Sequence, residues 1–357
     1  MYKQRLQKVR QEITRTGVDG IILTDSPTVR WATGLDSSNA LLYVTDSETI
    51  LMTDGRYIEA ARQVVTNAEA AIGRPGSLAR ALAEKLGTRA GQAHRLGFAA
   101  DHVTIGKRND LQMFFPGCAL VPLTGFLQEA RVQKSPEEIE AMTRAQAITD
   151  AVFGEILAVI KPGIAEKELV AELVYRQLQH GAEEMSFWPI VASGPNTALP
   201  HVKAGDRKTQ KNDVVLLDFG CTVDGYCSDM TRTVHIGAPS PKFRKVYATV
   251  LKAQQAALGA AKAGLAASEL DATARKVIKA DGYDIPHGLG HSLGLEAHEW
   301  PAVNPRTYAP LSESAVITIE PGIYLPGEFG VRIEDMIVLQ PEGCRSLTTS
   351  PKELIIL

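Results

Sequence analysis

The 357-residue sequence has no long apolar run and no excess of basic charge. Without about 18 consecutive apolar residues, a membrane-spanning helix is not expected. A formal net charge of −3 gives no basic footprint for nucleic acid. The first residues, MYKQRLQKVRQEITRTG, place apolar residues at helical spacing among charges, which indicates a surface helix and not a signal peptide. We therefore expect a cytoplasmic protein that binds neither nucleic acid nor membranes.

Cysteine is scarce as well. Only four cysteines occur, and none of them belongs to a C-x-x-C pair of the kind found in zinc and redox sites. Cys221 and Cys227 lie on the two arms of a hairpin predicted below and could face one another there. Because disulfides are rare in the cytoplasm, we expect free thiols.

The length suits two domains. Residues 1–125 alternate helix and strand signals, beginning with a helix over about 2–17 and the strand segments GIILTD, NALLYVT and TILMTD. A helix follows from near Gly55, and further apolar segments lie around Leu96 and Ala119. Strands interleaved with helices predict an α/β domain with a partly parallel sheet.

Residues 126–357 begin a second domain. Ser135, Pro136 and Glu138 form the signature of a capped helix start, and this helix is expected to stop at 161–163. KPGIAEKELVAEL at 161–173 aligns without a gap with KAGLAASELDATA at 262–274, and a helix is expected at about 165–180. A chance match between alanine-rich helices is one explanation. The shared order of long helix, second helix and acidic hairpin favours an α+β domain of two duplicated halves.

The first half ends in VVLLDFGCTVDGYCSDMTRTV, where Asp-Gly predicts a hairpin with Asp218 and Asp229 on its two arms. A turn centred on 224–225 pairs Asp218 with Thr231 and leaves Asp229 diagonal to Asp218. A centre one residue earlier puts the two carboxylates directly opposite. In either register they share one face, with Cβ atoms roughly 5–8 Å apart.

The second half ends in VITIEPGIYLPGEFGVRIEDMIVL, in which a strand carries Glu320, turns through Pro-Gly and returns with Glu334. Taken alone, either hairpin is explained by exposed acids on an edge strand. Both hairpins carry acids in matching places, however, and a buried anion is very costly unless it is paired or bound to metal. We therefore expect the four carboxylates to meet.

Three of the eight histidines lie within PHGLGHSLGLEAHEW, namely His287, His291 and His298. The proline and glycines predict loop or extended chain and not the H-E-x-x-H helix of zinc peptidases. Four carboxylates and one imidazole form an oxygen-rich site suited to two divalent ions. Such ions can bridge a water, lower its pKa and clamp a tetrahedral intermediate, so we expect hydrolysis.

The segments DFG, YCSDMTR, HGLGHSLGLEAHE, IEPGIY and VRIED resemble the metallopeptidases with the pita-bread fold, above all Xaa-Pro dipeptidases (prolidases) and short aminopeptidases P. The resemblance is strong over 131–340 and weaker over WATGLDSSNALL and TDGRYIEAA in the first domain. It implies a creatinase-like α/β N-terminal domain, which closes the active site and makes dimer contacts. An α+β pita-bread catalytic domain with an internal pseudo-twofold duplication follows.

The resemblance also implies which residues hold the metal. The first Asp chelates one ion, the second Asp bridges both, the His and the first Glu bind the other ion, and the last Glu bridges. In that order these residues are Asp218, Asp229, His291, Glu320 and Glu334. Glu320 would also carry a proton from the bridging water to the leaving nitrogen. Two manganese ions per subunit are expected, and zinc or cobalt would also suit the shell.

Further residues match the substrate site of this family. His298 corresponds to the residue that steadies the scissile carbonyl or its oxyanion, and His201 and His287 correspond to histidines of the pocket. Arg332 either meets a substrate carboxylate or holds the ligand network in a salt bridge. Asp36, in GLDSSN, is a candidate for binding the substrate ammonium and is otherwise a turn residue.

Phe187, Trp188 and Tyr324 are candidates for the walls of a proline pocket, although aromatic residues commonly serve the core. The resemblance therefore predicts a homodimeric Xaa-Pro dipeptidase that cleaves proline-containing dipeptides with a metal-bridging hydroxide. One alternative is an aminopeptidase P that acts on longer peptides. A methionine aminopeptidase normally lacks such an N-terminal domain. A non-catalytic pita-bread module or a metal-free creatine hydrolase would typically have lost ligands that are all present here.

Overall fold

The computed structural model describes residues 1–74, 76–91 and 94–357. The chain divides into two compact units between Ala130 and Arg131, a few residues after the boundary expected from the sequence. Each unit has a hydrophobic core of its own. Among the described residues, no helix combines the length and the apolar character that crossing a membrane would require.

A six-stranded sheet, in the order β4-β3-β2-β1-β5-β6, forms the centre of the first unit in the part of the chain that the structure describes. β2 pairs antiparallel with β1 and β3, and the other neighbours pair in parallel. The partly parallel α/β sheet expected from the sequence is therefore confirmed. Its strands are β1 (Gly20–Leu23), β2 (Ala40–Thr45), β3 (Thr49–Thr53), β4 (Glu69–Ile72), β5 (Arg95–Ala99) and β6 (Ala119–Leu123).

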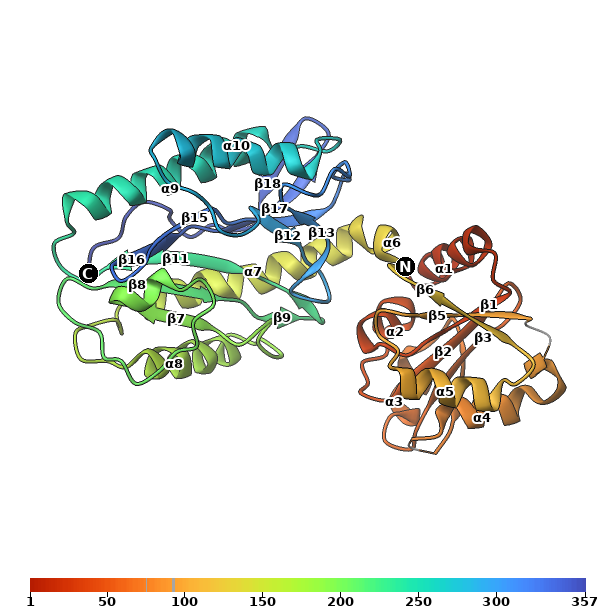
Figure 1. Ribbon diagram of the computed structural model, residues 1–357. Helices are drawn as coiled ribbons and strands as arrows, with labels where there is room; N and C mark the ends of the chain where they lie inside the picture. Colours follow the sequence, from red (N-terminus) through yellow and green to blue (C-terminus); the bar gives the residue numbers. More distant parts are fainter. Residues whose placement is uncertain (75, 92–93) are drawn as a thin grey trace. The chain divides into compact units, whose positions relative to one another are not determined.

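Helices cover both faces of this sheet, with α1 and α2 on one face and α4 and α5 on the other (Figure 1). Leu6, Val9 and Ile13 of α1 are buried, so the helix predicted over about 2–17 packs through its apolar positions. The helical segments are α1 (Tyr2–Thr16), α2 (Ser26–Thr33), α3 (Ile58–Val64), α4 (Leu78–Leu86), η1 (Gly87–Gly91), α5 (Ile105–Phe114) and α6 (Gln128–Val132).

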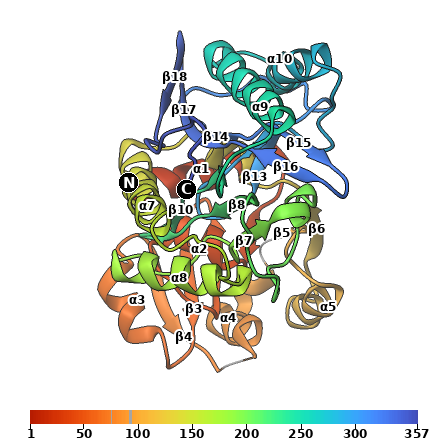
Figure 2. The same cartoon turned by 90° about the vertical axis from the view of Figure 1, so that its left-hand side faces the viewer.

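The second unit contains two helix pairs, and Figures 1 and 2 show α9 and α10 on one side of the strands and α8 on the other. The pairs are α7 (Pro136–Ile156) with α8 (Glu166–Gln179), and α9 (Pro241–Ala260) with α10 (Ala267–Ala280). The capping box predicted at Ser135 is present, since the Glu138 carboxylate accepts the Ser135 N–H at 2.7 Å. α7 ends at Ile156, before the expected stop at 161–163. Turns follow the helix, and the apolar pattern continues because Ile160 still packs into the core.

The strands of this unit form two main sheets, ordered β11-β8-β7 and β13-β12-β14-β17-β18, with two short hairpins, β10-β9 and β15-β16. The Glu334 N–H donates to the Thr231 carbonyl at 3.1 Å, which joins the two acidic hairpins at this point. The elements are β7 (Ile190–Ser193), η2 (Gly194–Ala198), β8 (Val214–Phe219), β9 (Thr222–Val223), β10 (Tyr226–Cys227), β11 (Met230–His235), β12 (Gly290–Ser292), β13 (Glu299–Val303), β14 (Val316–Ile319), β15 (Gly322–Leu325), β16 (Phe329–Arg332), β17 (Asp335–Gln340) and β18 (Gly343–Ser346).

The two halves of this unit share backbone hydrogen bonds that match the aligned segments of the sequence. The Gly163 N–H donates to Thr209 O, and the Gly264 N–H donates to Leu311 O, both at 2.8 Å. An antiparallel bridge precedes the second helix in each half, at Ala165–Lys208 and at Ala266–Pro310. Equivalent residues therefore occupy equivalent places, as the internal duplication requires.

All four cysteines lie in the described part of the chain, and all are free thiols. Burial raises the pKa of Cys221, and it raises the pKa of Cys227 to about 12. Both thiols are buried and protonated at neutral pH, so they behave as small apolar side chains of the hairpin.

Candidate metal centre and substrate pocket

The first acidic hairpin adopts one of the two registers open from the sequence. Asp218 on β8 pairs with Thr231 on β11. Asp229 comes two residues before Thr231, so its side chain lies diagonal to that of Asp218 on the same face of the hairpin. The alternative with the two carboxylates directly opposite is wrong. The tight turn through Asp224 and Gly225, both at positive φ, sets this register.

The second acidic hairpin holds its two glutamates at a break in the ladder. Ile319 pairs with Asp335 and Gly322 pairs with Arg332, so the shared register puts Glu320 opposite Glu334. Neither glutamate belongs to a strand, because the pairing pauses at Pro321, whose nitrogen has no hydrogen to donate. The chain turns later, at Pro326-Gly327, where Gly327 has a positive φ.

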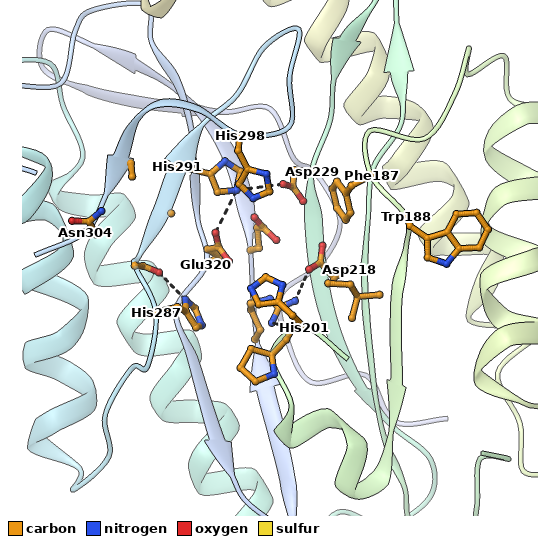
Figure 3. Close-up of a pocket in the computed structure, with 17 residues that line it drawn as sticks. Phe187, Trp188, His201, Asp218, Asp229, His287, His291, His298, Asn304 and Glu320 are labelled. Atoms are coloured by element: carbon orange, nitrogen blue, oxygen red, sulfur yellow. Dashed lines mark hydrogen bonds and ion pairs between the residues drawn. The ribbon is translucent and has the colours of Figure 1, made fainter. Parts of the chain in front are cut away.

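His291 lies on the short strand β12, in agreement with the extended chain expected from its glycine-rich surroundings. Gly290 lets β12 approach β14, since a Cβ there would lie 2.1 Å from the Thr318 carbonyl oxygen. The His291 Nδ1 faces the Ser292 carbonyl at 3.1 Å, which assigns the ring hydrogen to Nδ1. The bare Nε2 then faces Glu320 Oε1 at 3.5 Å and Asp229 Oδ2 at 3.6 Å (Figure 3).

The carboxylates of this cluster are buried, or part-buried in the case of Glu320, and they repel one another. Burial, and then the charge of Glu334, raises the pKa of Asp229, while burial and Glu320 raise that of Glu334. Burial and the charge of Asp218 raise the pKa of Glu320 to about 8. Burial lowers the pKa of His291 to about 4, which keeps its Nε2 free of a proton at neutral pH.

These side chains fit a divalent cation. Ligand atoms of Asp229, His291 and Glu334 all lie within 4.8 Å of one another. The Asp218 Oδ1 is buried and has no hydrogen-bond partner among the described residues, which leaves one carboxylate oxygen to be satisfied. A positive ion would relieve the repulsion that raises the acid pKa values, and oxygen and imidazole donors suit Mn²⁺ or Zn²⁺.

The cluster lines a cavity of about 440 Å³, and the structure brings all five expected metal ligands to the wall of this cavity. His201, His287 and His298 line the same cavity, as Figure 3 shows. The rings of His298 and His291 are 4.3 Å apart between centroids. Burial lowers the pKa of His298, and it lowers that of His287 to about 4, so neutral imidazoles face the cavity.

Arg332 is almost fully buried, with every arm of its guanidinium in use. It forms an ion pair with Asp218 Oδ2, and its Nε donates to the Thr231 hydroxyl at 3.0 Å. Its Nη1 donates to the Tyr324 hydroxyl at 2.8 Å and to the Pro200 carbonyl at 3.3 Å. Of the two roles open from the sequence, this geometry matches the salt bridge that holds the ligand network.

The aromatic candidates take different places. Phe187 and Trp188 line the cavity, and Trp188 is 66% exposed there. Tyr324 is not among the residues that line the cavity. Its hydroxyl contacts both Arg332 and His287, and the distance from the hydroxyl to His287 Nε2 is 2.9 Å. Asp36 lies in the first unit, with an exposed side chain 3.2 Å from Arg30. Its role toward a substrate stays a prediction.

Three polar residues of the site were not predicted from the sequence. The Thr231 hydroxyl donates to Glu334 Oε2 at 2.6 Å, and the Thr318 hydroxyl donates to Glu320 Oε1 at 3.3 Å. Each threonine lies on a hairpin arm that carries an acid, two positions from Asp229 or Glu320. Residues two apart on a strand point to the same face, so this spacing could have predicted both threonines from the sequence. Asn304, which lines the cavity, gave no signal beyond an Asn-Pro turn.

The fold and the buried donors define a hydrolase-type metal centre on a duplicated α+β domain. Residues 140–341 match the model of metallopeptidase family M24, and residues 5–133 match the creatinase/prolidase N-terminal domain. The chain therefore belongs to the M24 metallopeptidases with a creatinase-type N-terminal domain, as the resemblance of its motifs indicated.

Similar proteins support this assignment over the whole length. An uncharacterised peptidase of Bacillus subtilis, YqhT, is 39% identical over 99% of this chain and 100% of its own. A solved Xaa-Pro dipeptidase from Bacillus anthracis is 35% identical, with a TM-score of 0.96 and all of both chains covered. A solved X-Pro aminopeptidase from Thermotoga maritima is 34% identical, with a TM-score of 0.90 over 97% of this chain and 100% of that one.

Proposed function

We propose that this chain is a Xaa-Pro dipeptidase that hydrolyses the peptide bond before proline in dipeptides. The observation that carries the proposal is the convergence of four carboxylates, three of them buried and that of Glu320 part-buried, and the bare Nε2 of His291 on the wall of one cavity. The similarity to the Bacillus anthracis dipeptidase over the full chain supports the choice of substrate.

The five side chains would hold two divalent ions, with manganese preferred and zinc or cobalt as alternatives. They are Asp218, Asp229, His291, Glu320 and Glu334. When bound, such ions lower the pKa of a water to near neutrality and polarise the scissile carbonyl. The Thr231 and Thr318 hydroxyls orient Glu334 and Glu320, since a hydroxyl that accepts an N–H must turn its own hydrogen toward the carboxylate.

The remaining residues move protons and position the peptide. Glu320 takes a proton from the attacking water and passes it to the leaving proline nitrogen. His298, neutral and beside His291, donates a hydrogen bond to the carbonyl oxygen as charge develops on it. His201 and His287 contact the substrate from the cavity wall. Arg332 holds Asp218 in place, and Tyr324 supports His287 from behind.

The setting of the enzyme forms part of the same proposal. By the family resemblance, an N-terminal domain, often that of the dimer partner, closes the site over the dipeptide, and Asp36 is the candidate for binding the substrate ammonium. Two chains form a homodimer, as the family resemblance implies. Four free thiols are what a reducing compartment maintains, which supports a cytoplasmic location.

The size of the peptide separates a dipeptidase from an aminopeptidase. We expect the manganese-loaded enzyme to cleave Ala-Pro at least about tenfold more efficiently than Ala-Pro-Ala, because a dipeptidase recognises the free carboxylate of proline, which the tripeptide replaces with an amide. The measurement is kcat/KM for both peptides by release of alanine. Efficient turnover of the tripeptide would overturn the dipeptidase assignment in favour of aminopeptidase P, the activity named for the Thermotoga maritima structure.

A further inference from the structure

Charged side chains surround Glu299, the residue that follows His298 in the chain. Its Oε1 accepts from Arg131 Nη2 at 2.5 Å, and its Oε2 accepts from Lys134 Nζ at 3.0 Å. The Lys134 and Glu299 side chains are only 2% and 6% exposed. Arg131 also pairs with Glu296 at 2.8 Å. Placing this many charges away from water is costly, so the cluster needs a reason beyond stability.

The Glu299 carboxylate also closes a turn of the backbone. Its Oε1 accepts the Leu295 N–H at 3.0 Å and the Glu296 N–H at 3.4 Å. Gly294 makes room for it, because a Cβ at that position would lie 2.8 Å from Glu299 Oε1 and 2.9 Å from Lys134 Cε. The Gly294 carbonyl in turn accepts the Cys227 N–H at 2.7 Å, next to the first acidic hairpin. The turn is therefore fixed from several sides through one carboxylate.

This turn carries His298 into the cavity. β12 pairs with β13 up to His291–Ala302, and the register then jumps so that Ser292 pairs with Glu299. Residues 293–298 form the loop that connects Ser292 to Glu299, and His298 is the last residue of this loop. With Glu299 anchored, the His298 ring lies against His291 on the cavity wall.

We propose that Glu299, anchored by Arg131 and Lys134, is the positioning residue for His298. The inference rests on the proposed function, in which His298 stabilises the carbonyl oxygen. His298 lines the cavity and Glu299 is not among the lining residues, so the Glu299 side chain is held by Arg131 and Lys134 while the His298 ring faces the cavity. Burial opposes the charge of Glu299, but Lys134 and Arg131 hold its pKa down at about 2, which keeps the anchor ionised at all working pH values.

The test is a double-mutant cycle measured on Ala-Pro with the manganese-loaded full chain. Glu299→Gln is expected to lower kcat about 10- to 100-fold with KM changed less than about threefold, as for other residues that orient catalytic groups. In a His298→Ala background the same change is expected to lower kcat less than about twofold, because its effect passes through the histidine. The bound manganese, counted by metal analysis, is expected to stay as in the wild type.

A second variant covers the case in which Glu299→Gln does not fold. Gly294→Ala keeps every charge but pushes the Glu299 carboxylate from its place, and it should reproduce the loss of kcat and its dependence on His298. Asp213→Asn is the matched control, because it breaks the Arg207–Asp213 ion pair of the other half and should leave kcat unchanged.

Three results would overturn the inference. The first is an equal loss of kcat in the wild-type and His298→Ala backgrounds. The others are a normal kcat in folded Glu299→Gln and Gly294→Ala, and a loss of bound manganese. A wild-type chain without activity on Ala-Pro would overturn the proposed function and this inference with it. An active wild type with additive effects would overturn the inference alone.

Discussion

Replacing Asp229 by alanine is expected to lower kcat/KM on Ala-Pro by at least about a thousandfold. Asp229 contributes to the group of metal-ligand atoms that lie within 4.8 Å of one another, and its carboxylate faces His291 across the cluster. A thousandfold loss corresponds to about 4 kcal/mol of transition-state stabilisation, a plausible share for a metal site that activates the water and polarises the carbonyl. The measurement is steady-state hydrolysis of Ala-Pro with manganese in excess.

Asp206→Ala provides the matched control for this substitution. Asp206 belongs to the same unit, but its side chain is 84% exposed and pairs with Lys167 at the surface. Its removal should leave kcat/KM within about twofold of the wild type, since surface substitutions of this kind change little. Full activity of Asp229→Ala would show that the metal hypothesis is wrong.

Removal of the metal is expected to make folding stability fall as the pH rises from about 6.5 to about 8. In the metal-free protein Asp229, Glu320 and Glu334 have raised pKa values, so the folded state holds protons that the unfolded state has released. Stability of this origin is present below the ordinary carboxyl pKa and is lost as the pH rises through the raised values. For Glu320, with a pKa of about 8, the loss from pH 6.5 to 8 is roughly 2 kcal/mol.

Two histidines make a smaller, opposing contribution in this window. His287 and His291 have pKa values lowered to about 4, so their contribution to stability grows from about pH 4 to about 7.5. Each adds only about 0.4 kcal/mol between pH 6.5 and 8, which is less than the loss at Glu320. Urea unfolding at pH 6.5 and 8 with a chelator measures the fall. Metal-free Glu320→Gln should lose less stability over the same window. Saturating manganese should remove the slope and add about 2.7 kcal/mol per bound ion at a hundredfold excess over Kd. A metal-free stability that rises from pH 6.5 to 8 would contradict the description of the cluster.

The metal ligands could be predicted from the sequence because they interrupt the apolar runs of buried strands. An aspartate within VVLLDFG and a glutamate within VITIEPG are costly residues for buried strands, and two matching hairpins made a common site the simplest explanation. Parity alone put Asp218 and Asp229 on one face, but it left two registers open. The positive φ at Asp224 and Gly225 decides between them, and this backbone geometry lies beyond what parity gives.

The partners of the ligands were harder to predict, because they depend on competition between distant groups. Arg332 could have pointed at a substrate, and only the packed structure shows its donors taken by Asp218, Thr231, Tyr324 and Pro200. The anchor at Glu299 joins residues more than 160 positions apart in the chain. Nothing in local periodicity or propensity marks such a pairing.

Helices with a strong sequence pattern were predicted, whereas short helices were not. Strongly patterned elements such as α1 and the capped start of α7 lie where the sequence places them. α2, α4 and α5 were not predicted, and each is only 8 to 10 residues long. Short helices gain much of their stability from tertiary packing, here against the sheet of the first unit, so their local signals are weak.

Five side chains of the second unit are proposed to hold two divalent ions for hydrolysis before proline. The number of bound ions can be measured by isothermal titration of the metal-free chain with manganese at neutral pH, combined with metal analysis after dialysis. We predict two ions per chain in the wild type, and fewer than two in Asp229→Ala together with its loss of Ala-Pro hydrolysis. A wild-type chain that cleaves Ala-Pro at full rate with no bound metal would contradict the account.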